Sequence, residues 1–281
     1  MFLLCASAGA TTYYVSPSGD DGASGLSEGE AWATLDRGDR MGILTAGDTI
    51  KVLPGTYYPG ATATLSSDGA AGSPVVYMAA EDERPLFDGQ GQEFIGLQID
   101  AARVEVVGLE FTAFDANTIF VGGNNSLITD CYIHDVLRDG MRVIGDDITI
   151  RRNIITRTEE HAIYIMDQAE RAHVYGNSLV NCHKNGVEVE SNVTTIRIFN
   201  NLIVSNDKGI FAKGNGNVAA FNLMWNNNGE DYGDGIVDSA GGVNADPLLA
   251  DTSAGDFSLL DGSPAIDAGL DLGYWFHDSA P

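Results

Sequence analysis

The chain has 281 residues, of which 44% are hydrophobic, so it is large enough to form one domain with a substantial core. Its formal net charge is −25, which argues against nucleic acid as a partner because phosphate binding requires a basic surface. The charge does not exclude an anionic polysaccharide, since a few local cations or a bound divalent metal can reverse the field inside a groove. No apolar run is long enough to span a bilayer.

The first residues, 1–10, are apolar and small, and they contain sequences that could precede a signal-peptidase cut. The basic leader of a signal peptide is missing. We interpret this stretch as the remnant of a secretion signal, with a short apolar first strand as the alternative. A secreted, extracellular or periplasmic location is therefore expected.

Residues 31–46, AWATLDRGDRMGILTA, are the best helical candidate of the chain. A stacked fold leaves its end strands uncovered, and a helix here would plug the N-terminal end. The first coil of the stack is expected to follow directly, in DTIKVLPGTYY.

An amide repeats through the middle of the chain, at Asn153, Asn177, Asn201 and Asn222. Cys131 and Leu109 occupy the same place in the preceding segments, and successive members are 21 to 24 residues apart. A self-similar period of this length indicates a solenoid. Each amide can bond to the one above and below, so these asparagines are assigned a structural role.

Within each period the residues alternate, and three short strands fit each turn of the repeat. The sequence thus predicts an all-β fold, a right-handed parallel β-helix with three sheets. The residues expected to point inward are Met141, Val143, Ile163, Ile165, Val187, Val189, Ile210 and Ala212. Cys131 and Cys182 are expected to be free and buried, because they lie at different heights two coils apart.

The repeat stops near residue 240. The prolines and aspartates of residues 241–281 suggest an irregular cap that folds over the last coils. The predicted organisation is therefore a signal remnant over 1–10, the β-helix with its N-terminal cap over 11–240, and a C-terminal cap and tail over 241–281.

The outward positions of one sheet carry the candidate chemistry. Arg142, Tyr164 and Glu188 should form one row, with His161 and Lys184 overhanging it from the preceding turns. Cleavage of a uronic-acid polymer by β-elimination needs a cation to neutralise the carboxylate, a base for the C5 proton and an acid for the leaving oxygen. Substrate contacts are expected from Arg138, Glu188 and Phe211.

Each role suits a particular side chain. Arg142 can neutralise the carboxylate through its bidentate fork, Tyr164 and His161 can transfer protons, and Lys184 can act as the base if its pKa is depressed. Structural alternatives stay open: an Arg142–Glu188 ion pair, stacking of Tyr164, solvated His161 and Lys184, and a Glu190–Lys213 pair.

Clustered carboxylates without cysteine favour a hard cation such as Ca²⁺. Four acidic residues are candidates to bind it: Glu188, Glu190, Asp139 and Asp167.

Two stretches, YYVSPSGDDGASGLSEGEAWATL and AGDTIKVLPGTYY, resemble the opening of secreted right-handed β-helix proteins of the pectate-lyase superfamily, notably polysaccharide lyase family 9. The segment DPLL…FSLLDGSPAIDAG resembles their C-terminal coil. The resemblance implies the β-helix fold, secretion and a polysaccharide substrate. GIFAKG is similar to the catalytic lysine strand of family 9, with Lys213 two residues later, so Lys213 is a second base candidate. VEVES resembles the calcium-binding Glu-x-Glu of family 6.

The leading hypothesis is a secreted lyase, acting as a monomer on an anionic polysaccharide such as alginate, pectate or a glycosaminoglycan. A C5-epimerase would use the same proton abstraction. A non-catalytic carbohydrate-binding or surface β-helix is the main alternative. A glycoside hydrolase ranks lower, because Asp146 and Asp147 fall in a turn away from the row.

Overall fold

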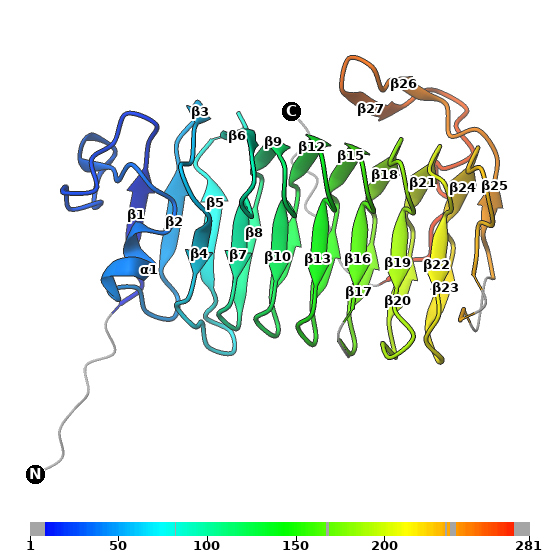
Figure 1. The fold of residues 1–281 in the computed structure, drawn as a ribbon, viewed down its shortest axis with the longest axis horizontal. Helices are drawn as coiled ribbons and strands as arrows, with labels where there is room; N and C mark the ends of the chain where they lie inside the picture. The colour runs from blue at the N-terminus through cyan, green and yellow to red at the C-terminus, as the bar shows by residue number, and fades with distance from the viewer. Residues whose placement is uncertain (1–8, 82, 167–168, 234, 237–239, 273–281) are drawn as a thin grey trace, which may run out of the picture.

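The structure is a computed structural model that describes residues 9–272 except 82, 167–168, 234 and 237–239. It is a right-handed parallel β-solenoid of about eight turns with three parallel sheets, as the sequence predicts (Figure 1). Within the described part of the chain, no helix is long and apolar enough to cross a membrane.

Three strands make up each coil, one in each sheet, and every neighbouring pair within these sheets is parallel. Sheet A contains β1 (Thr12–Val15), β2 (Thr49–Val52), β5 (Val75–Ala79), β8 (Val104–Val107), β11 (Leu127–Thr129), β14 (Thr149–Arg151), β17 (His173–Tyr175), β20 (Arg197–Phe199) and β23 (Val218–Ala220). Sheet B contains β3 (Thr56–Tyr57), β6 (Leu86–Gln92), β9 (Glu110–Phe114), β12 (Tyr132–Val136), β15 (Ile154–Thr158), β18 (Ser178–Val180), β21 (Leu202–Val204), β24 (Leu223–Trp225) and β25 (Val243–Asn244). Sheet C contains β4 (Ala63–Leu65), β7 (Leu97–Ile99), β10 (Ile119–Val121), β13 (Met141–Val143), β16 (Ile163–Ile165), β19 (Val187–Val189) and β22 (Ile210–Ala212).

The core is a column of aliphatic side chains inside the solenoid. All eight residues predicted to point inward from sheet C are buried, at 0% or 1% exposure. Because equivalent residues pair in register from coil to coil, each apolar side chain packs on its counterpart above and below.

The repeated asparagines form the ladder that the sequence predicts. Asn177 Oδ1 accepts bonds from the backbone N–H and the side chain of Asn153, each at 3.0 Å, while Asn177 Nδ2 donates to Ile150 O and Asn201 Oδ1. Asn201 repeats the pattern with Asn222, and Cys131 N–H donates to Asn153 Oδ1. The buried amides are therefore fully paired.

A second, shorter ladder was not predicted. Cys182 N–H donates to Asn206 Oδ1, and Asn206 N–H donates to Asn227 Oδ1. Cys182 and Cys131 are both free and buried, as expected.

Three corners of the solenoid hold residues with positive φ, where Asp and Arg from successive coils meet. Asp130, Asp135 and Asp147 have φ of 60°, 53° and 57°, and their arginine partners have φ of 53°, 52° and 58°. The resulting ion pairs join the side chains two by two: Asp130 with Arg152, Asp135 with Arg157, and Asp147 with Arg171. These pairs are half-exposed, so each contributes modestly to stability.

The N-terminal end is covered mostly by loops. The helix expected over residues 31–46 is reduced to α1 (Arg37–Met41), preceded by a short 3₁₀ turn η1 (Glu28–Glu30). Gly42 ends α1 in the left-handed region at φ 63°, which explains the early stop. Trp32 covers the first coil instead, stacking on Tyr13 with a centroid distance of 4.7 Å.

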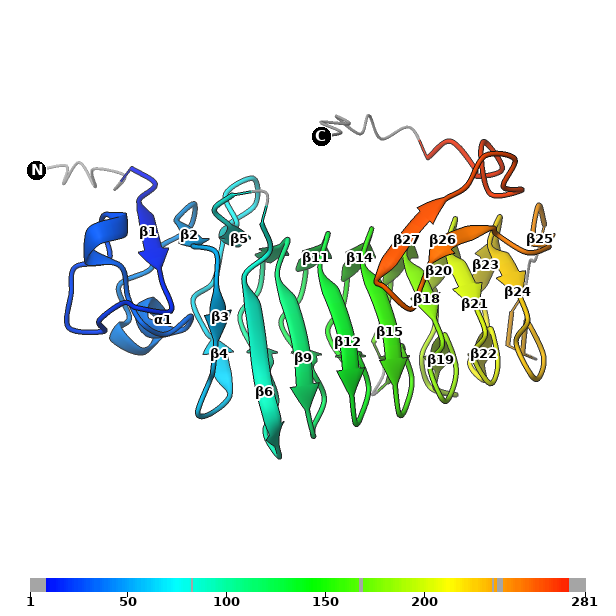
Figure 2. The ribbon, with the colours of Figure 1, turned by 90° about the horizontal axis from the view of Figure 1, so that it is seen from above.

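The C-terminal segment folds over the last coils, along the outer face of sheet B (Figures 1 and 2). Its strands β26 (Leu249–Asp251) and β27 (Asp256–Leu259) pair antiparallel. Phe257 is buried with Val180, Val204 and Leu223, and Asn200 exchanges hydrogen bonds with Leu270.

Candidate functional site

The predicted row lies on the outer face of sheet C. Arg142 pairs in register with Tyr164, Tyr164 with Glu188, and Glu188 with Phe211. Because parallel strands are about 4.8 Å apart, these side chains stand beside one another along the solenoid axis. The repeat predicted this placement; the roles assigned to the residues stay predictions.

Arg142 is held by Asp139. Its Nε and Nη2 lie 3.1 and 2.9 Å from Asp139 Oδ2, and the Asp139 side chain is completely buried. Burial raises the pKa of Asp139, although the charges of Arg142 and His161 oppose the shift. The alternative of an Arg142–Glu188 ion pair across the intervening coil is not found: Arg142 pairs with Asp139, and Glu188 pairs with Lys213.

Tyr164 lies at the centre of the row. The Arg142 guanidinium carbon is 5.2 Å from the centroid of its ring, and the His161 ring is also 5.2 Å away. The hydroxyl donates a hydrogen bond to Glu190 Oε1. Burial and this carboxylate raise the pKa of Tyr164, so the phenol keeps its proton at neutral pH.

His161 does overhang the row, as predicted. Burial lowers its pKa, so the imidazole is neutral at pH 7. Its Nδ1 accepts a long bond, 3.3 Å, from the Asn185 N–H. A neutral imidazole next to a protonated phenol is a combination that can both accept and donate a proton.

Both lysines predicted as bases hold ion pairs. Lys213 Nζ is 2.7 Å from Glu188 Oε1, and Lys184 Nζ is 3.3 Å from Glu160 Oε1. A lysine in such a pair must give up its partner and its proton before it can act as a base. The alternative of a Glu190–Lys213 pair is not found: Lys213 pairs with Glu188 of the same coil as Glu190, and Glu190 accepts a hydrogen bond from Tyr164.

Two of the predicted substrate contacts are engaged within the protein. Glu188 is 5% exposed and also accepts a bond from Asn185 Nδ2. The ring of Phe211 is approached by Lys208 Nζ at 3.8 Å and by Lys213 Nζ at 5.1 Å. Arg138 remains largely exposed, in a 3.4 Å pair with Glu160.

Arg138 and Arg142 line one hollow of about 360 Å³ together with Glu93, Asp115, Ala116 and Asn117. Arg138 lies in the turn just before β13 and Arg142 lies in β13 itself, so the two arginines come from one coil and line the same space. An anionic group entering it would meet Arg142 beside Tyr164.

The carboxylates proposed for calcium do not fit a metal site as the structure holds them. Asp139 binds Arg142, Glu188 binds Lys213 and Glu190 accepts from Tyr164. No group of three or more metal-binding side chains occurs among the described residues, and Asp167 lies outside them. Calcium thus stays an expectation, and no chemical step is derived through it.

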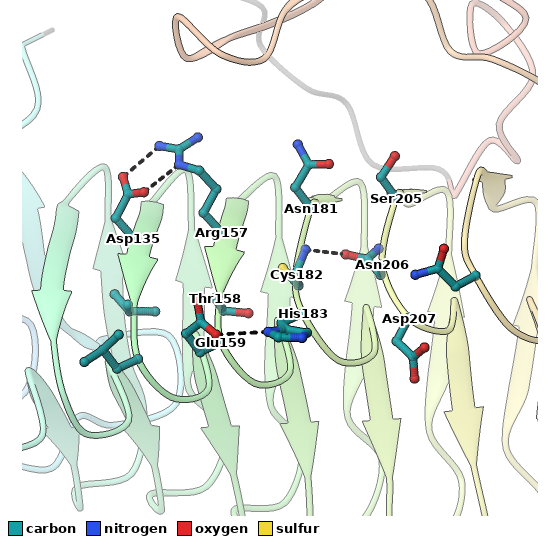
Figure 3. Close-up of a pocket in the computed structure, with 13 residues that line it drawn as sticks. Asp135, Arg157, Thr158, Glu159, Asn181, Cys182, His183, Ser205, Asn206 and Asp207 are labelled. Carbon is teal, nitrogen blue, oxygen red and sulfur yellow. Dashed lines mark hydrogen bonds and ion pairs between the residues drawn. The ribbon is translucent and has the colours of Figure 1, made fainter.

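A second hollow is not predicted by the sequence pattern, because its residues lie at a corner rather than on a sheet face. It occupies about 630 Å³ where the chain turns from sheet B to sheet C, across several coils. Figure 3 shows the Asp135–Arg157 and Glu159–His183 pairs along this hollow, with the hydrogen bond from Cys182 to Asn206 beside them. Asp at one position and Arg 22 residues later, on the repeat spacing, was the signal that could have found this corner.

Asp146 and Asp147, the aspartates considered for glycoside hydrolysis, lie in a different part of the coil from the Arg142 row. Asp147 pairs with Arg171, and Asp146 Oδ1 accepts from the Glu170 N–H. Both follow β13 at the turn toward sheet A, as the sequence indicates. They do not join the row.

The three parallel sheets define a right-handed parallel β-helix, and the row of polar residues lies on its outer face. Residues 13–170 match the family described as Pel9A-like, right handed beta helix region, and residues 95–246 match the right handed beta helix region family. The chain therefore belongs to the Pel9A-like right-handed β-helix family, which confirms the resemblance drawn from its opening residues.

Solved structures agree with this assignment at the level of fold. Pectate lyase Pel9A is 16% identical, with a TM-score of 0.68 over 96% of this chain and 94% of that one. An alginate lyase from Paenibacillus sp. str. FPU-7 is 17% identical, with a TM-score of 0.60 over 72% and 76%. A GH136 lacto-N-biosidase from Eubacterium ramulus is 14% identical, with a TM-score of 0.59 over 79% and 55%. No curated protein sequence matches the chain.

Proposed function

We propose that this protein is a polysaccharide lyase that cleaves an anionic uronic-acid polymer by β-elimination. The observation that carries the proposal is the meeting of Arg142, Tyr164 and His161: one fixed guanidinium and two proton-transfer groups, with both ring distances to Tyr164 at 5.2 Å. Similarity of fold to a pectate lyase and an alginate lyase supports it as an analogy.

The proposed chemistry assigns one task to each group. Arg142 pairs with the uronate carboxylate and stabilises the negative charge that develops when C5 loses its proton. Neutral His161 accepts that proton, exchanging its long bond with Asn185 for the substrate. The electrons form the C4–C5 double bond as the C4–O bond breaks, and Tyr164 protonates the departing oxygen.

This assignment narrows the set of catalytic candidates. Lys184 and Lys213 become charge partners of Glu160 and Glu188 rather than bases. Glu190 becomes a positioning residue, because it holds the Tyr164 hydroxyl. We also propose a secreted or periplasmic monomer. The apolar N-terminal residues support secretion, but residues 1–8 lie outside the described part of the chain.

The test is formation of an unsaturated uronate, measured by ultraviolet absorbance, from alginate, pectate and glycosaminoglycans, with and without a chelator. Product from one of these polymers, abolished by Arg142→Ala, is the expected result. If none of the polymers gives product while one is bound, a non-catalytic carbohydrate-binding protein is the better assignment.

That second candidate is favoured by one specific observation. Arg142, Lys184 and Lys213 all hold carboxylate partners within the protein, which leaves little unbalanced positive charge on the row. A C5-epimerase would be recognised by proton exchange with solvent at C5 without chain cleavage, followed by NMR.

A further inference from the structure

A third hollow lies at the N-terminal end of the solenoid, well before the coil that carries Arg142. It has a volume of about 600 Å³, in the range of about 300–1,000 Å³ that ligand pockets occupy. One wall comes from the segment around α1, and the other from the turn between β3 and β4. The hollow therefore lies between the N-terminal cap and the first coils.

Aromatic and aliphatic groups make up much of its lining. Tyr57 and Phe87 come from paired strands of sheet B, and their rings stack at a centroid distance of 4.8 Å. Both side chains are buried and line the hollow. Tyr58 also lines the hollow and is 61% exposed, so its ring is accessible to a ligand. An exposed ring beside a buried pair provides a flat apolar surface for a ligand ring.

Polar groups converge on the same space from one side. Asp36, which is 8% exposed, lies 3.2 Å from Arg40 Nε through Oδ1. Arg40 also lies 2.8 Å from Asp21 Oδ2, and its side chain is half exposed. Thr34 belongs to this cluster, donating to Asp21 Oδ2. Donors and acceptors are thus fixed next to the aromatic wall.

The charged side chains around the hollow, Arg40, Asp21 and Asp36, indicate the charge of the ligand that it can bind. Arg40 is shared by Asp21 and Asp36, so its charge is already balanced and it attracts a third anion only weakly. Burial raises the pKa of Asp36, but Arg40 acts against this shift and favours the charged carboxylate. A cation would find Asp36 already paired. An uncharged ligand with several hydroxyl groups and an apolar face meets both parts of the lining without such competition.

We propose that this hollow binds a neutral saccharide unit, with a sugar face against Tyr58 and hydroxyls on Asp36 and Arg40. The site is separate from the Arg142 row and does not depend on the lyase proposal. It would let the protein hold an uncharged glycan, or an uncharged segment of a mixed polymer, at the end of the solenoid.

The experiment is calorimetric titration of the full chain with neutral oligosaccharides (xylo-, manno-, cello- and galacto-) and, in parallel, with oligogalacturonate and oligoalginate. Two variants address the hollow. Tyr58→Ala removes the exposed ring. Gly60→Trp adds bulk where a Cβ would meet no atom within 4 Å, so the fold can accept it. Leu260→Ala, at a 50% exposed leucine of the C-terminal cap, is the matched control.

We expect one neutral series to bind, and its affinity to fall about ten-fold or more in Tyr58→Ala and in Gly60→Trp but not in Leu260→Ala. Product formation at the Arg142 row should be unchanged in both variants, which separates this proposal from the lyase assignment. Binding of no neutral series overturns the proposal. So does binding that neither variant weakens, or uronate oligomers that bind more tightly than neutral ones and lose affinity in Tyr58→Ala.

Discussion

Arg142 and Asp139 are fixed to each other at the start of β13, with the guanidinium 2.9 and 3.1 Å from one oxygen of a carboxylate that has no solvent exposure. The carboxylate fixes the plane of the guanidinium and leaves 28% of the arginine side chain exposed. An arginine oriented in this way is prepared to receive a substrate carboxylate without reorganising.

Arg142→Lys should therefore reduce kcat for product formation by roughly 10²–10³-fold, because a lysine provides a point charge without the fork. The melting temperature should change little in comparison. Arg171→Lys, which alters an exposed arginine paired with Asp147 at another corner, is the control and should retain full activity. Equal activity of Arg142→Lys and the wild type in the absorbance assay would contradict the role of Arg142.

His161 and His134 should give opposite pH dependences of stability. Burial lowers the pKa of His161 from its ordinary value near 6.5. For His134 burial acts in the same direction, but hydrogen bonds with Glu110 and Asp135 outweigh it and raise the pKa. The native fold therefore favours the neutral form of His161 and the protonated form of His134.

The sign for each follows from linkage. His161 contributes stability above pH 6.5 that is lost as the pH falls through its lowered native pKa. His134 contributes stability below pH 6.5 that is lost as the pH rises through its raised native pKa. Melting temperatures of His161→Gln and His134→Gln, each compared with the wild type between about pH 5 and 8, measure both effects. Parallel pH profiles for the two differences would show that the environments are misassigned.

The repeat predicts the fold because each coil satisfies the same two demands, an apolar interior and a paired amide. Both demands leave a periodic mark, at Ile163 and Val187 for the interior and at Asn153 and Asn177 for the ladder. The row of Arg142, Tyr164 and Glu188 follows from the same register.

The partners of these outward residues could not be predicted in the same way. Arg142 could reach along its own turn to Asp139 or across the coils, and the choice depends on the local path of the turn. The N-terminal helix was overestimated for a related reason, since Gly38 and Gly42 weaken it and the packing of Trp32 needs no helix. Side-chain pairing and capping depend on local geometry that period alone does not encode.

The asparagine ladder should be extendable by one residue at its N-terminal end, where Cys131 precedes Asn153. Cys131 Sγ already lies 3.4 Å from Thr129 O and 4.0 Å from Val106 O, the carbonyls that correspond to those used by Asn201. Cys131→Asn should therefore add hydrogen bonds and raise the free energy of unfolding by about 1 kcal/mol.

The opposite change tests the same ladder. Asn177→Leu removes the acceptor of both the N–H and the side chain of Asn153 and should cost about 3 kcal/mol. Asn181→Gly is the matched control, because Asn181 is exposed and its φ of 57° suits glycine. Denaturant unfolding measures all three, and a loss in Asn181→Gly as large as that in Asn177→Leu would argue against the ladder as the source of stability.

The C-terminal hairpin should open independently of the solenoid. Phe257 is 9% exposed, packs edge-on against Tyr132 at 6.1 Å and is the buried anchor that β27 contributes to sheet B. Phe257→Ala removes this contact while every ladder and core residue stays in place, so the coils retain their own stabilising interactions. Hydrogen exchange should then accelerate over residues 249–259 and remain slow at Asn153, Asn177 and Asn201. Faster exchange at the ladder as well would mean that the hairpin is part of one cooperative unit with the coils, and that sheet B needs its cover in order to stay folded.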